Sequence, residues 1–221
     1  MAESVTNRRK KGGADEGVEA PASADPTERE APRRGSDPVT DARQRMVQDP
    51  SDAAARLDLA RLYRDRGDLG LALEQLESAR SDDPDQVDVL LQLGITLGAL
   101  GRQTDAEKEL RRAQRLAPER ADVSAHLGVV LFKRGLYRQA EAELKHALEL
   151  DDQNGDAYFY RGEALNQLSR VDDALEMLER AVQFQPGNAR AYYTMGILYD
   201  RKHLRQEATT MYRKAREVGA A

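Results

Sequence analysis

A chain of 221 residues is long enough for one or two domains. One third of its residues are charged (33%) but the formal net charge is only −5, so the concentrated basic face of a nucleic-acid-binding protein is excluded and no nucleic-acid partner is expected. The chain contains no cysteine, which excludes a disulfide framework, a thiol nucleophile and cysteine-ligated zinc, and favours a cytoplasmic location.

No membrane or secretory segment is expected. No apolar run approaches the ~18 residues that a transmembrane helix needs. The basic cluster from Arg8 to Lys11 is not followed by an apolar stretch, so it does not begin a signal peptide. It is interpreted as a solvated charge run, with a nuclear import signal as the alternative in a eukaryotic cell.

The N-terminal part of the chain changes character near residue 37. Residues 1–36 lack Leu, Ile, Phe, Tyr and Trp, so they cannot bury enough apolar surface to offset their ordering entropy, and a disordered tail is predicted. Residues 37–52 are predicted to form a short helix and a linker, because Asp37 and Pro38 suit the N-cap and first helical positions. The apolar stripe of this helix is Val39, Ala42 and Met46.

From Leu57 onward, Leu and Ala recur at helical spacing and no alternating strand pattern is present, so the region is predicted to be entirely helical. Its sequence repeats with a period of 34 residues, and the repeat is visible as columns of small, large or helix-ending residues. The columns are Ala72, Ala106, Ala140, Ala174 and Ala208; Ala79, Ala113, Ala147, Ala181 and Ala215; Gly94, Gly128, Gly162 and Gly196; Leu76, Leu110, Leu144, Leu178 and Tyr212; and Pro84, Pro118 and Pro186.

The columns predict a helix A, a short turn and a helix B in each unit. Small residues let helices approach closely, large residues fill the space between them, and Pro ends helix B. A single pair cannot bury its apolar face, whereas stacked pairs can, so the units are expected to form a solenoid. Five units are predicted: 53–86, 87–120, 121–154, 155–188 and 189–221.

This pattern resembles the tetratricopeptide repeat (TPR) family, over about three quarters of the chain. The second unit carries the family's pattern as Leu90, Leu93, Gly94, Leu97, Ala106, Leu110, Ala113 and Pro118. The fourth carries Tyr158, Gly162, Leu165, Ala174, Leu178, Ala181 and Pro186, and the last carries Tyr192, Met195, Gly196, Tyr199, Ala208, Tyr212 and Ala215. The resemblance implies an all-α, right-handed superhelical solenoid of antiparallel helix pairs. Arg56, Ser124 and Arg161 depart from the pattern, because a large apolar residue is usual at each place.

The resemblance also implies a site. In the family, helix A lines a concave groove that binds peptide segments of partner proteins. The residues carried over to this groove are Leu91, Ile95, Val129, Phe132, Phe159, Glu163, Asn166, Tyr193 and Ile197. Its middle is expected to be apolar, aromatic and open to a partner; the alternative is that these side chains are partly covered packing residues.

Several other motifs have simpler explanations. Arg66-Gly67-Asp68 matches the integrin adhesion signal, but Gly67 and Asp68 fall at the turn between helices A and B, where Gly suits a left-handed conformation and Asp68 can cap helix B. The stretch from Asp152 to Asp156 hints at a calcium loop, but Ala157 stands where glycine is needed and a helix is expected to start there.

The chaperone-tail clamp of some family members is not matched by Leu57, Arg61, Gln92, Asp122 and His126. The column Asp88, Asp122 and Asp156 is explained by helix dipoles, or alternatively favours a basic ligand.

No catalytic, metal-binding or cofactor motif is found: the three histidines lie in different units without ligand spacing, and no phosphate loop or nucleophile elbow is present. The sequence therefore predicts a non-enzymatic adaptor that binds a protein or peptide. The alternative is a structural scaffold that self-associates through the ends of the solenoid as a homo-oligomer.

Overall fold

The computed structural model describes residues 37–49 and 52–220, and the predicted disordered tail (1–36) lies outside them. These described residues form eleven α-helices and no strand. The helices are α1 (Pro38–Gln48), α2 (Ala53–Asp65), α3 (Leu69–Asp82), α4 (Val87–Ala99), α5 (Gln103–Leu116), α6 (Ala121–Lys133), α7 (Tyr137–Leu150), α8 (Gly155–Gln167), α9 (Val171–Phe184), α10 (Ala189–Arg201) and α11 (Arg205–Gly219).

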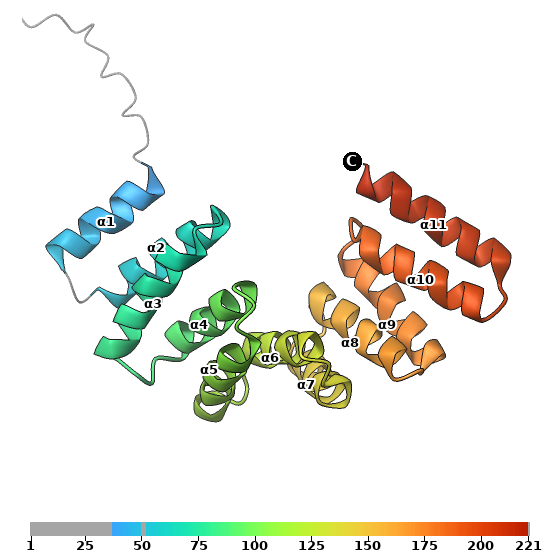
Figure 1. Ribbon diagram of the computed structural model, residues 1–221, viewed down its shortest axis with the longest axis horizontal. Helices are drawn as coiled ribbons and strands as arrows, with labels where there is room; N and C mark the ends of the chain where they lie inside the picture. The colour runs from blue at the N-terminus through green and yellow to red at the C-terminus, as the bar shows by residue number, and fades with distance from the viewer. Residues whose placement is uncertain (1–36, 50–51, 221) are drawn as a thin grey trace, which may run out of the picture. The chain divides into compact units, whose positions relative to one another are not determined.

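After α1, the helices form five pairs that succeed one another along the chain (Figure 1). In each pair an even-numbered helix, called helix A below, precedes an odd-numbered helix B. Each helix B contacts the helix A of its own unit and that of the next. The backbones of consecutive A helices also lie close together, whereas consecutive B helices of the described residues meet through longer side chains such as Arg80 and Glu109, so the A helices line the inner side of the array. The expected solenoid of antiparallel helix pairs is confirmed.

The repeat columns form the core. The large residues of helix B, Leu76, Leu110, Leu144 and Leu178, are fully buried, and the alanines beside them are buried too. The glycine of helix A makes this possible, because an added Cβ at Gly94 would overlap the Leu110 side chain. Leucine and glycine therefore interlock in the second, third and fourth units, whereas Gly196 meets Tyr212 in the fifth.

The turn between helices A and B has a residue in the left-handed backbone conformation at the same repeat position in all five units. Gly67, Gly101 and Gly135 have φ of 85°, 78° and 78°, and Ser169 and His203 both have φ of 61°. The left-handed turn predicted at Gly67 is therefore confirmed, and it explains the adhesion-like tripeptide as turn chemistry. Asp68 is at the N-cap position of α3, as predicted, but its carboxylate accepts no capping hydrogen bond.

Two glycines of α4 allow a matched test of this packing. We expect Gly94→Ala to lower the free energy of unfolding by about 1–3 kcal/mol, because the new methyl group overpacks the contact with Leu110. Gly98→Ala places its Cβ 3.6 Å from Val130 Cγ2, an ordinary contact, and should raise stability by roughly 0.5–1 kcal/mol, because alanine favours the helix. Urea unfolding of both variants measures the difference; equal effects would contradict the interlock.

Candidate functional site

A hollow of about 1010 Å³ lies against α8, α10 and α11. Four of the residues carried over from the sequence line it: Glu163, Asn166, Tyr193 and Ile197. The remaining lining residues are Gln167, Ala189, Arg190, Thr194, Tyr212, Ala215 and Arg216. The hollow therefore runs from the inner side of the array, at α8, to the last helix B, α11.

The floor of the hollow is aromatic. Tyr193 is 56% exposed and Ile197, one helical turn onward, is 37% exposed. The rings of Tyr193 and Tyr212 pack with centroids 5.5 Å apart. Tyr212 stands in the column that holds a buried leucine in the other units, and its O–H donates a 2.8 Å hydrogen bond to Asp200. This hydrogen bond fixes the ring that supports Tyr193.

The exposure of Tyr193 is unlike that of its repeat equivalents. Leu57, Leu91, Ala125 and Phe159 stand 34 residues apart in the same column, and each is 3–7% exposed. Phe159 shows why, because Arg190 of the next helix A lies over its ring, with the guanidinium carbon 5.1 Å from the centroid. No described residue occupies the corresponding place over Tyr193, so its ring faces outward.

The rim of the hollow holds charges without ionic partners. The guanidinium of Arg216 makes no hydrogen bond or ion pair with the described residues, and that of Arg190 has only the Phe159 ring. Glu163 has a buried carboxylate oxygen that accepts no hydrogen bond within the described residues. At the α8 side, Asn166 accepts a 2.7 Å hydrogen bond from Arg201. The rim therefore presents two cations and one carboxylate to a ligand.

The rest of the expected groove is more closed than the sequence suggested. Leu91 and Phe159 are buried, so the expectation that Phe159 is open to a partner is wrong, because Arg190 covers it. Ile95, Val129 and Phe132 are half-buried, and the Phe132 ring packs edge-on against Tyr160. Only the end formed by Tyr193 and Ile197 is an open apolar surface among the expected groove residues.

Sequence reasoning missed Arg190, Tyr212 and Arg216 as site residues. A signal for Arg190 was present, because it replaces the aspartate of the column Asp88, Asp122 and Asp156. The signal for Arg216 is its replacement of Val182 from the preceding unit.

The acidic column itself is used within the protein. Arg120 donates to Asp88 at 3.0 Å and to Asp122 at 2.6 Å. Hydrogen bonds to Asp122 and Asp88 raise the pKa of Arg120, and the bond from Arg120 lowers the pKa of Asp122. Asp156 accepts a 3.0 Å hydrogen bond from Gln185. These internal partners account for the column without a basic ligand.

The suspected calcium loop is a helix start. Asn154 is the N-cap of α8, and its side chain accepts a 2.9 Å hydrogen bond from the Ala157 amide. Among the residues that the structure describes, no cluster of three His, Cys, Asp or Glu side chains is arranged to hold a metal ion. Nor is any helix in those ranges long and apolar enough to cross a membrane.

The phenol of Tyr212 gives a pH-dependent test of the floor. Partial burial, together with the hydrogen bond to Asp200, raises the pKa of Tyr212 to about 12, against about 10 for a free tyrosine. Because the folded pKa is the higher one, the stability that this phenol contributes is present below pH 10 and is lost as the pH rises toward 12.

We expect Tyr212 to be only about one-tenth ionised at pH 11. The measurement is the difference in phenolate absorbance between the native chain and Tyr212→Phe, with circular dichroism confirming that both remain helical. A difference amounting to nearly one full phenolate at pH 11 would contradict the hydrogen-bonded floor.

Comparison with known proteins agrees with this architecture. A profile of the family described as "Tetratricopeptide repeat" matches residues 41–87, 57–121, 91–137 and 126–189, which together make up more than half of the chain. No match was found among curated proteins.

Three solved structures illustrate the similarity. A crystal structure of MamA is 30% identical with a TM-score of 0.64, and the match covers 73% of this chain and 95% of that one. YrrB, described as "a TPR protein with an unusual peptide-binding site", is 25% identical with a TM-score of 0.63, covering 81% and 93%. A MamA fragment from Desulfovibrio magneticus RS-1 shares the fold at 23% identity and a TM-score of 0.67, covering 76% and 95%. The family match, the helix pairs and the repeat columns together show that this chain belongs to the tetratricopeptide repeat family.

Proposed function

We propose that this protein is a non-enzymatic adaptor whose hollow at α8, α10 and α11 binds a segment of a partner protein. The observation that carries the proposal is the exposure of Tyr193, which stands in a column that is buried in every other unit. An exposed aromatic residue beside a second apolar side chain, Ile197, is typical of the anchoring centre of a protein interface. The peptide-binding site named for the relative YrrB supports the same kind of ligand.

The chemistry of the lining favours binding over catalysis. None of the lining residues is His, Cys or Ser, and the Thr194 hydroxyl is not hydrogen-bonded to the Glu163 carboxylate, so no nucleophile–base pair is assembled there. The volume of about 1010 Å³ lies at the upper end of the roughly 300–1,000 Å³ of small-molecule sites, and the hollow faces solvent over an exposed tyrosine. A protein segment that covers Tyr193 suits this surface better than a compact ligand.

The partner segment extends, in this proposal, along the inner side of the array. Phe132, Val129 and Ile95 are half-buried and present the edges of apolar side chains along α6 and α4. Leu91 and Phe159 support this surface from beneath.

Self-association through the same end of the array is the alternative. The exposed Tyr193 and Ile197 favour it, since a second copy would cover them. A symmetric contact places Arg190 and Arg216 of both copies close together, and their repulsion opposes it. Light scattering over a concentration series separates the two functions, because the adaptor stays monomeric throughout.

A photo-cross-linker at position 193 tests the adaptor. We expect p-benzoylphenylalanine in place of Tyr193 to form an adduct with one protein in host cells. The same group in place of Val47, which is 82% exposed on α1, is expected not to do so.

The cross-linked protein is then purified and its affinity is measured against the native chain and Tyr193→Ser. Loss of an anchoring aromatic side chain is expected to weaken binding by about thirty-fold, while circular dichroism shows unchanged helix content because the ring is largely solvent-exposed. Adducts that are equal at both positions, or an affinity indifferent to the substitution, would remove the hollow as the binding site.

A further inference from the structure

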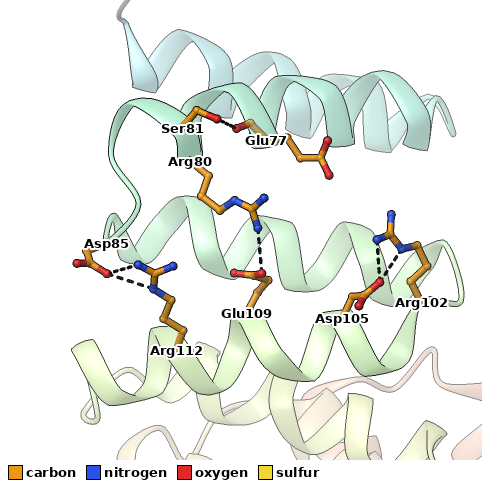
Figure 2. Close-up of polar contacts among 8 residues, drawn as sticks. All are labelled: Glu77, Arg80, Ser81, Asp85, Arg102, Asp105, Glu109 and Arg112. Atoms are coloured by element: carbon orange, nitrogen blue, oxygen red, sulfur yellow. Dashed lines mark hydrogen bonds and ion pairs between the residues drawn. The ribbon is translucent and has the colours of Figure 1, made fainter.

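One column of helix B determines how each unit contacts the next. In the first unit, Arg80 donates a 3.0 Å hydrogen bond to Glu109 on helix B of the second unit (Figure 2). Glu109 is only 6% exposed, and Arg80 is its ionic partner. One repeat later, Gln114 donates a 2.7 Å hydrogen bond to Glu143 on the following helix B. In both cases the acceptor lies 29 residues after the donor.

The same column is apolar in the next two units, and its counterpart changes with it. Leu148 and Val182 replace the polar donors, and methionines replace the glutamates 29 residues onward. Leu148 and Met177 line one small cavity, while Val182 and Met211 pack against the same core. In the first two units a polar donor of this column faces a glutamate, and in the third and fourth an apolar residue of this column faces a methionine.

In the fifth unit the column returns to arginine, as Arg216. It lines the hollow, and among the described residues its guanidinium has no hydrogen-bonding or ionic partner. By the pattern of the other units, its counterpart is a carboxylate on a helix B that lies against α11. Arg190 adds a second cation to the same rim, while the one carboxylate in the lining, Glu163, lies at the α8 side.

The uncovered aromatic surface indicates what the first helix of the binding partner must cover. In the preceding unit, the first turn of the next helix A covers Phe159 through Arg190. A helix in the corresponding place would cover Tyr193 and pack on Ala215, whose column is buried in all four earlier units. The surface therefore suits the packing of a helix pair. It is called the end seat and consists of Tyr193, Ile197, Tyr212, Ala215, Arg190 and Arg216.

We propose that the end seat binds an acidic helical hairpin of a partner protein, placed as a following repeat would be, with a carboxylate on its second helix bound to Arg216. The inference rests on the proposed function and names the class of partner. An apolar stripe on the first helix covers Tyr193, and acidic flanks meet the unpaired Arg190 and Arg216. A lysine-rich hairpin of the same shape is repelled by the two arginines.

The chain supplies its own probe. A synthetic 34-residue hairpin of residues 87–120 carries Glu109, which would face Arg216 as it faces Arg80 within the chain. This hairpin has six basic and five acidic residues, so it tests the contact of Glu109 with Arg216 and not the acidic flanks. Three versions, with Glu109 retained or with E109Q or E109K, are titrated against the full-length protein by fluorescence anisotropy. Affinity is expected to fall in the order Glu, Gln, Lys, with about five-fold or more between the first and last.

Charge reversal at the seat provides the decisive comparison. Arg216→Glu is expected to invert the order, so that the E109K hairpin binds best. Arg205→Glu makes the same charge change at the exposed start of α11, outside the hollow, and is expected to keep the original order. Equal affinities for the three hairpins, or one order in both protein variants, would overturn the proposal.

A hairpin too unstable to bind when free is tested in linked form. Joined to residue 221 by a flexible linker, it is held at an effective concentration of roughly millimolar. Its glutamate version is then expected to raise the midpoint of thermal unfolding more than the E109K version; no difference overturns the proposal.

Cross-linking at Tyr193 that succeeds while the hairpins fail leaves the adaptor function standing with another kind of partner. If the cross-linking and the hairpin titrations both fail, the adaptor function and the hairpin partner are both overturned. Self-association that is abolished by Tyr193→Ser overturns the hairpin in favour of a second copy.

Discussion

Each helix pair in this protein is covered by the pair that follows it, and the rest of the structure depends on this relation. The two helices of one unit cannot bury all of their apolar surface against each other, so the remaining apolar surface packs against the next unit. The interlock of Gly94 with Leu110 brings helices A and B close enough for the residues between units to meet. The proposed binding surface arises from the same relation, since it is the surface of the last unit over which no described unit lies.

Polar contacts between units align the array more than they stabilise it. Arg120 connects Asp88 and Asp122, and Arg80 reaches Glu109 across two units. Most of these side chains are partly exposed, and such pairs contribute at most about 1 kcal/mol each. Their spacing of one unit still favours a single register, because a shift of one unit would set Leu148 against the carboxylate of Glu143. The stability comes from the leucine and alanine columns, and the charges determine which unit fits which.

Much of the fold was predictable because its determinants are local and repeated. The alanine columns recur in every unit and the glycine and leucine columns in four of the five, so each repeat supports the assignment of the others. The turn positions were also predictable, even where Ser169 replaces glycine, because the repeat fixes their place. Polar departures were resolved by partners in space: Arg161 binds Glu141 at 3.0 Å, and Ser124 lies 3.2 Å from a ring nitrogen of His146.

The site was predicted less well, for a physical reason. Phe159 and Tyr193 have the same place in the repeat and similar aromatic chemistry, yet one is buried and the other exposed. The difference lies in what covers each ring, which depends on neighbouring helices and not on the residue itself. Arg216 likewise looks like an ordinary surface arginine in the sequence. Only the contact of Arg80, at the same repeat position, with Glu109 indicates that this position pairs with the following helix B.

The left-handed turns at Ser169 and His203 make backbone strain differ between the first and last units of the array. A residue with a side chain in this conformation carries roughly 1–2 kcal/mol of strain that glycine avoids, and the two such residues, Ser169 and His203, both lie in the last two units. In a linear array, local opening starts where intrinsic stability is lowest and neighbours are fewest. Among the described units, the last carries one of these turns and packs against one described neighbour, so α10 and α11 are expected to open before the units in the middle of the array. A partner that docks there raises the local unfolding free energy of this segment, and its presence is readable as slowed amide exchange in α10 and α11.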